Sequence, residues 1–339
     1  MAQIITITSG KGGVGKTSIS LNLSLALARR GYRVCLFDAD LGMANVNILT
    51  GLVPEFGLET VMDGERGLPD IMIRDFQGVD IIPGSSGVAR MADLSGSEAQ
   101  SLVRAFLALD DYDFFIFDTS AGISAQVMAF CRACREILLV VTPEPTSLTD
   151  AYALIKALAR FPKLPPIQVV VNQVRTLDQA KKAYGRLKRT VERFLPVTIS
   201  ARGIVPRDPK VAVAVSSQIP FGTLFPNSPA SRAVQSLARK LTQAEVPDLP
   251  LELFWDQCLS YLLPRPLEKT PKQPAPVDEV AVLNQRLERM EDQMARILET
   301  VTRLEEALNA KTAAESNPQP YDSDENVVSL DFEGWMAGK

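Results

Sequence analysis

A glycine-rich segment near the N-terminus carries the residue types that bind phosphate groups. Residues 10–17 read GKGGVGKT, which matches the pattern G-x-x-x-x-G-K-[ST]. Glycines let backbone N–H groups curl around phosphates, a lysine adds positive charge, and a threonine hydroxyl can bind Mg²⁺. The segment follows an apolar run and opens a helical pattern, whose N-terminus adds positive potential. We therefore predict a nucleotide site made by Gly10, Lys11, Gly12, Gly13, Val14, Gly15, Lys16, Thr17 and Ser18.

Carboxylates follow two later apolar runs. Asp38 and Asp40 lie in FDADLG, and Asp118 ends FFIF and opens DTSAGI. In a parallel sheet the carboxyl ends of the strands share one edge, where ligands gather. Carboxylates at that edge can hold Mg²⁺, mostly through water, and can position water for phosphoryl transfer. The alternative for each aspartate is a helix or turn cap.

The scaffold that positions these residues follows from the apolar pattern. Near-continuous apolar runs alternate with helical patterns, which predicts a parallel sheet covered on both faces. We predict an α/β fold with a doubly wound, mostly parallel sheet. The predicted strands are 3–8, 33–38, 79–83, 113–118, 136–143 and 167–172, with a short one before Pro206, and the clearest helices are 97–109, 147–160, 177–194 and 229–244.

Composition divides the chain into five parts. The α/β domain takes residues 1–245, and a short amphipathic apolar segment takes 246–263. Residues 264–276 form a proline-rich linker, residues 277–311 a heptad helix, and residues 312–339 an acidic tail expected to be disordered.

Bulk properties exclude several function classes. The 339 residues include no histidine, which excludes histidine acid–base chemistry and histidine–metal sites. The net charge of −4 argues against a protein built mainly to coat nucleic acid. Four cysteines are too few for a disulfide framework, and neither a signal peptide nor an apolar run of about 18–20 residues is seen. We therefore expect a cytoplasmic location.

Lys11 makes the loop more specific than a general phosphate-binding motif. KGGVGKT resembles the deviant Walker A motif of the MinD/ParA ATPases, in which the first lysine reaches the partner's nucleotide across a dimer. The resemblance implies slow, partner-stimulated ATP hydrolysis and an ATP-sandwiched homodimer. It implies catalytic roles for Lys11, Lys16 and Asp40, and Mg²⁺ contacts for Thr17, Asp40 and Asp118. MinD-like proteins usually have proline where this chain has Ser120.

The same resemblance assigns four residues beyond the loop. Asn172 ends IQVVVN, where the family reads adenine, and Pro206 and Asp208 in IVPRDPKV resemble its P-x-D loop beside the base. Glu144 in TPEPTSLTD matches a segment at the dimer and partner face. The alternatives are a turn residue for Asn172 and a solvated loop for Glu144.

Residues 38–64 and 79–95 resemble the FlhG/FleN branch of this family. That branch implies control of flagellar number and placement, with an FlhF-type GTPase or switch-complex proteins as partners. Three alternatives stay open: a MinD/ParA-type cell-division or DNA-partition ATPase, an ATP-binding scaffold, and an Fe–S carrier of the Mrp class. The carrier alternative rests on Cys131-x-x-Cys134, which two buried helical cysteines also explain.

Two surface features carry alternatives of their own. Residues 249–263 are apolar and aromatic and contain no basic residue. One alternative is that they contact the inner membrane reversibly, possible sites including a cell pole. The other is that they pack on the α/β domain. One helix is rich in basic residues, which suits DNA or simply a solvated face. These residues are Lys181, Lys182, Arg186, Lys188, Arg189 and Arg193.

Apolar residues from Val280 to Leu308 recur at alternating steps of three and four, which predicts a coiled-coil dimer rather than a single packed helix. Such a coil would hold two ATPase domains at roughly millimolar effective concentration. We expect the full chain to sediment as a dimer without nucleotide. A monomer at micromolar concentration in sedimentation velocity would contradict this prediction.

Overall fold

The computed structural model describes residues 2–40, 45–52, 54–84, 96–109, 111–243 and 249–262. Met1–Arg265 forms one compact unit. The predicted linker, coiled coil and acidic tail, residues 264–339, lie outside the described residues.

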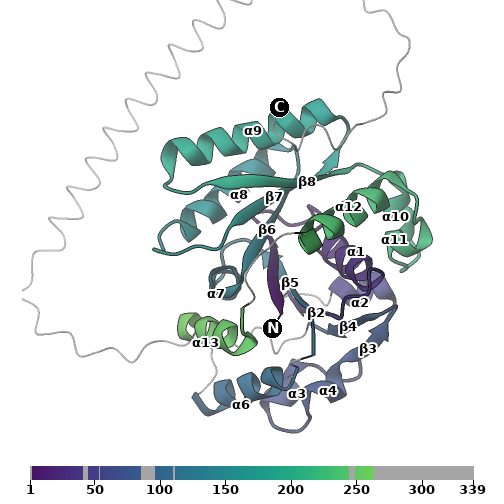
Figure 1. Cartoon of the computed structure of the whole chain (residues 1–339), viewed down its shortest axis with the longest axis vertical. Helices are drawn as coiled ribbons and strands as arrows, with labels where there is room; N and C mark the ends of the chain where they lie inside the picture. Colours follow the sequence, from purple (N-terminus) through teal and green to yellow (C-terminus); the bar gives the residue numbers. More distant parts are fainter. Residues whose placement is uncertain are drawn as a thin grey trace, which may run out of the picture. The chain divides into compact units, whose positions relative to one another are not determined.

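The sheet has eight strands in the order β3-β4-β2-β5-β1-β6-β7-β8 (Figure 1). All neighbouring strands are parallel except β3 and β4, so the predicted doubly wound, mostly parallel sheet is confirmed. The apolar pattern missed the antiparallel edge strand β3, because its four residues, IRDF, are only half apolar. The bounds are β1 Gln3–Ser9, β2 Val34–Ala39, β3 Ile73–Phe76, β4 Val79–Ile82, β5 Phe114–Ala121, β6 Glu136–Val141, β7 Ile167–Val174 and β8 Ile199–Pro206.

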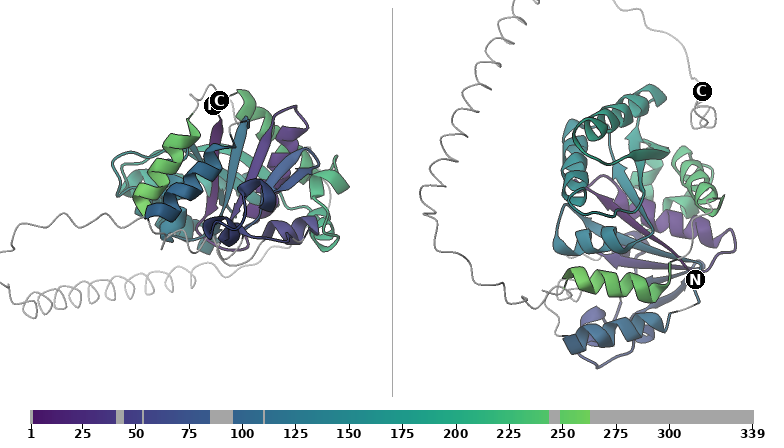
Figure 2. Two further views of the ribbon diagram at one scale, coloured as in Figure 1. Left: turned by 90° about the horizontal axis from the view of Figure 1, so that it is seen from below. Right: turned by 60° about the vertical axis from the view of Figure 1, so that its left-hand side comes forward.

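Helices cover both faces of the sheet, which explains why strands such as β2 and β6 are buried throughout (Figures 1 and 2). One layer holds α1 Lys16–Ala28, α2 Asn45–Thr50, α10 Pro209–Ser216, α11 Phe221–Leu224 and α12 Pro229–Gln243. The other holds α6 Gly96–Leu107, α7 Ala125–Ala133, α8 Pro145–Leu158, α9 Leu177–Phe194 and α13 Leu251–Leu262. The short helices α3 Leu58–Met62 and α4 Leu68–Ile71 lie beside α6.

The apolar segment near residue 250 packs on the domain. Helix α13 lies against α6 and α7 (Figure 2), and Phe254, Trp255 and Cys258 are fully buried there. The Trp255 ring packs against Phe106 at an interplanar angle of 33°, with 4.0 Å between centroids. The apolar face of α13 is thus occupied by the protein itself. No described helix is long and apolar enough to span a bilayer.

A cation clamp adds to this contact. The Arg132 guanidinium of α7 lies between two rings, 3.5 Å from the centroid of Phe161 and 3.4 Å from that of Tyr261 on α13. Such contacts between a cation and an aromatic face are attractive and strengthen where water is excluded. The clamp therefore fixes the C-terminal turn of α13 to the domain.

We expect Trp255→Ala to lower the free energy of unfolding by about 3–5 kcal/mol, because it removes the largest fully buried side chain and leaves a cavity. Urea denaturation measures the change. Leu253→Ala on the same helix is the control: its side chain is 44% exposed, so the expected loss is within about 0.5 kcal/mol. Equal losses for the two variants would contradict the packing of α13.

Candidate functional site

The loop between β1 and α1 forms a turn that requires glycine. Gly13 and Gly15 have φ of 75° and 92°, in the left-handed region that favours glycine. A Cβ on Gly10 would collide with the backbone of Asp150 and Ala151. The loop ends at Lys16, the first residue of α1. The structure therefore brings the predicted loop residues together at a helix N-terminus on the carboxyl edge of the sheet, where anions bind.

Lys16, at the end of this loop, lies close enough to Asp118 for their charges to interact. Burial lowers the pKa of Lys16, while the charges of Asp118 and Asp40 act to raise it. Asp118 is fully buried, and its Oδ1 accepts a 2.8 Å hydrogen bond from the Ser20 hydroxyl. Burial raises the pKa of Asp118 to about 6, against hydrogen bonds from Thr17 and Ser20 and the charge of Lys16. Its Oδ2 has no hydrogen-bond partner.

Asp38 is the second buried carboxylate; the sequence places it at the ligand-binding edge of the sheet but gives it no specific role. It pairs in register with Asp118 across β2 and β5 and is fully buried. Its oxygens accept hydrogen bonds from the backbone N–H groups of Asp40 at 3.3 Å and Val46 at 3.2 Å. Burial and the charge of Asp118 raise the pKa of Asp38 to about 8. The sequence feature that could have identified Asp38 as a site residue is its position beside Asp40 in FDAD.

These side chains fit a magnesium ion bound together with a nucleotide. Asp118 offers an unpartnered, buried carboxylate oxygen, and the Thr17 hydroxyl lies within hydrogen-bonding reach of that carboxylate. Among the described residues, no group of three or more Cys, Asp or Glu side chains could hold a metal alone. Mg²⁺ does not need one, because it is usually bound by one or two carboxylates, several waters and the phosphates of its substrate.

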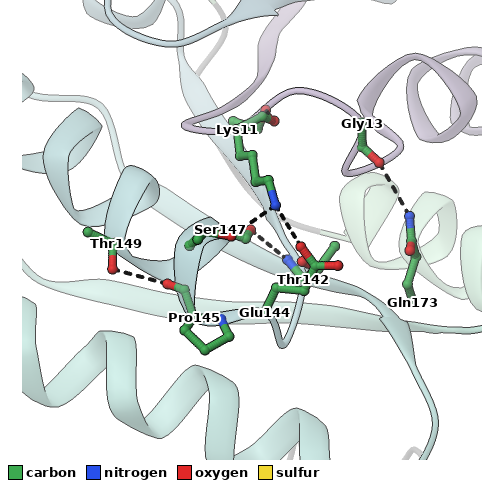
Figure 3. A network of polar contacts seen from close by, with 10 residues as sticks. Lys11, Gly13, Thr142, Glu144, Pro145, Ser147, Thr149 and Gln173 are labelled. Carbon is green, nitrogen blue, oxygen red and sulfur yellow. Dashed lines mark hydrogen bonds and ion pairs between the residues drawn. The ribbon is translucent and has the colours of Figure 1, made fainter.

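Figure 3 shows how the first lysine of the loop is held. Lys11 Nζ donates to Glu144 Oε2 at 2.7 Å and to the Thr146 hydroxyl at 2.9 Å. Glu144 precedes α8 at its N-cap position. Both side chains are solvent-exposed, 37% for Lys11 and 61% for Glu144. The structure thus joins two residues that the resemblance had assigned separately, through an exposed ion pair of a kind that contributes at most about 1 kcal/mol.

The residues expected near adenine make protein contacts in this structure. Asn172 is 7% exposed, and its Nδ2 donates to the Val14 carbonyl at 2.7 Å. Pro206 ends β8, and Asp208 caps α10 by accepting from Lys210 N–H at 3.0 Å. The other Asp208 oxygen accepts from the N–H of Ala230, which ties α10 to α12. Asn172 therefore lies against the phosphate loop, and Asp208 has a structural role as a double cap.

The cysteine pair is buried, as the second explanation of its sequence predicted. Cys131 lies in α7 and Cys134 follows the helix, and neither forms a disulfide. Burial raises the pKa of both thiols, that of Cys134 to about 12. Neutral, inaccessible thiols of this kind are poor metal ligands.

The raised pKa of Asp38 predicts a pH dependence. A carboxyl whose pKa is about 8 in the folded state and near 3.9 unfolded gives stability that is present at low pH and lost as pH rises toward 8. We expect Asp38→Asn to stabilise the nucleotide-free, metal-free protein by roughly 1 kcal/mol or more at pH 8.5 relative to its effect at pH 5. Denaturant melts at both pH values measure this; an effect independent of pH would contradict it.

Comparison with known proteins agrees with the geometry. Residues 5–221 match the family model of the CobQ/CobB/MinD/ParA nucleotide binding domain. The chain is 41% identical to the antiactivator FleN of Pseudomonas aeruginosa, over 76% of this chain and 94% of that protein. It is 31% identical to the flagellum site-determining protein YlxH of Helicobacter pylori, over 77% and 90%.

Solved structures show the same fold. MinD in the MinC:MinD cell division complex of Aquifex aeolicus matches with a TM-score of 0.60 and 26% identity, over 73% of this chain and 99% of that one. MinD of Pyrococcus horikoshii, solved with Mg-ADP, matches with a TM-score of 0.57 and 26% identity, over 72% and 97%. Together with the loop and its carboxylates, these likenesses show that the chain belongs to the MinD/ParA family of P-loop nucleotide-binding proteins, with FleN and YlxH among its relatives.

Proposed function

We propose that this chain is an ATP-driven dimerisation switch that hydrolyses ATP slowly and regulates flagellar number and placement. The observation that carries the enzymatic part is a glycine loop that ends at the buried Lys16, whose charge interacts with that of the buried Asp118, one oxygen of which has no hydrogen-bond partner. The flagellar part rests on likeness to FleN and YlxH over about three-quarters of the chain.

The residues divide the work of phosphoryl transfer. Loop N–H groups and Lys16 would bind the phosphates. Thr17 and Asp118 would hold a magnesium ion, which would neutralise phosphate charge. Asp40 orients the attacking water, and Asp38 fixes the Asp40 backbone through its N–H. Because these groups are preorganised and partly desolvated, they stabilise developing charge more than the same groups would in water.

Lys11 provides the link to dimerisation. In the proposed switch, Lys11 leaves Glu144 and Thr146 and contacts the nucleotide of the partner protomer. Its present ion pair is exposed, so the exchange costs little free energy, and a triphosphate is a more highly charged acceptor than one carboxylate. ATP would therefore favour the dimer, and loss of the γ-phosphate would release it.

For the partners and the location, we extend the likeness to FleN and YlxH. We propose an FlhF-type GTPase or flagellar switch-complex proteins as partners and a cytoplasmic protein. Peripheral membrane contact through α13 would first require undocking its buried aromatic face, and the Arg132 clamp opposes this. A role in cell-division positioning is the second candidate, supported by the fold of MinD.

Three substitutions test the switch. Lys16→Ala should abolish MgATP binding, because it removes the buried cation of the loop. Lys11→Ala should still bind ATP but should not undergo the ATP-induced change in dimer arrangement. Asp40→Ala should bind ATP, fail to hydrolyse it and therefore remain in the ATP-bound arrangement. Fluorescent-nucleotide titration and small-angle scattering with and without ATP measure both effects. ATP binding by Lys16→Ala with the affinity of the unmodified chain would contradict the proposal.

The biological role needs a separate test. Deletion of the gene should change the number of flagella per cell, and Asp40→Ala should not restore the normal number. An altered division site with a normal flagellar count would favour the second candidate.

A further inference from the structure

Two adjacent amide side chains at the end of β7 hold the outer side of the phosphate loop. Asn172 Nδ2 donates to the Val14 carbonyl at 2.7 Å. Gln173 Nε2 donates to the Gly13 carbonyl at 3.5 Å (Figure 3). The Asn172 side chain also accepts from the Gln173 backbone N–H at 2.8 Å, so both ends of its amide are engaged.

The backbone of β7 is distorted to make this possible. In a regular strand, successive side chains point to opposite faces, so residues 172 and 173 could not both reach one loop. Here the pairing of β7 with β8 shifts register between Val171 and Val174, and Gln173 adopts φ of 58°, which non-glycine residues rarely do. Bulges next to functional sites commonly re-aim side chains, and local strain gathers at such sites.

The two carbonyls are those whose orientation matters for phosphate binding. A trans peptide unit is planar and its C=O and N–H point in opposite directions. The Gly13 carbonyl points toward Gln173, so the Val14 N–H of the same peptide unit points away from β7. The Val14 carbonyl points toward Asn172, so the Gly15 N–H also points away from β7. Converging backbone N–H groups of this kind are the donors that a phosphate needs.

We propose that Asn172 and Gln173 are positioning residues that preset the Val14 and Gly15 N–H groups toward the phosphates of the bound nucleotide. The inference rests on the proposed nucleotide function. It also explains why residue 15 is glycine, since a Cβ there would lie 2.5 Å from Asn172 Nδ2.

Neutral substitutions test the proposal without adding charge near the phosphates. Gln173→Met and Asn172→Leu keep side-chain size but cannot donate. Gln168→Met is the matched control, because Gln168 lies on the same strand and contacts Ser200, away from the loop. Titrations use MgATP, MgGTP and magnesium tripolyphosphate with the full chain, and thermal melts check folding.

We expect Gln173→Met to weaken binding about threefold and Asn172→Leu about tenfold, by the same factor for all three ligands, with Gln168→Met unchanged. A loss confined to ATP would mean that Asn172 acts on adenine alone and would overturn the proposal, as would wild-type binding by Gln173→Met. If Asn172→Leu fails to fold, the exposed Gln173 decides. Gln173→Gly, which adopts positive φ freely, should bind as weakly as Gln173→Met.

The wild-type titration separates the two hypotheses. Absence of MgATP binding by the unmodified chain overturns the proposed function and the positioning role together. Normal binding by the wild type and by all variants overturns the positioning role alone.

Discussion

The site depends on two buried carboxylates that lie side by side with too little positive charge to balance them. Asp38 and Asp118 are in register on β2 and β5, both fully buried, with Lys16 as the nearby cation. Buried charges are costly unless they are paired and hydrogen-bonded. The raised pKa of each aspartate expresses that cost, and a magnesium ion would relieve it. The ligand-free protein is thus poised to gain stability from binding a cation with a nucleotide.

The same strands connect this site to the opposite face of the sheet. Phe37 and Phe117 directly precede the two aspartates. Because side chains alternate along a strand, the two rings point to the opposite face of the sheet. Both rings contact Trp255 of α13, with centroids 6.5 and 5.9 Å away. Any shift of β2 or β5 on nucleotide binding would therefore displace the Trp255 side chain and α13. Close-packed interiors transmit such displacements instead of absorbing them.

Sequence reasoning found what local patterns encode. The loop motif, the main strands and the buried cysteine pair are set by residues close together in the chain, and the structure agrees with each. It missed contacts between distant residues. Lys11 meets Glu144 across 133 positions and Asn172 meets Val14 across 158, and neither pairing has a local signature. The sequence also did not predict the polar strand β3 or the register of Asp38 with Asp118, because both depend on pairing with a neighbouring strand.

A phosphate loop must keep its N–H groups converging even when no phosphate is present, although its glycines have the most conformational freedom to lose. In this chain the loop is held on two sides by elements distant in sequence: the start of α8 holds Lys11, and the distorted end of β7 holds Gly13 and Val14. The Asn172 contact joins the loop backbone to a buried amide and so resists change, whereas the Gln173 contact is exposed and longer. The Lys11 contact is an exposed ion pair that exchanges readily. One loop can thus keep its phosphate-binding part in place and still release Lys11, the lysine that we propose reaches a second protomer.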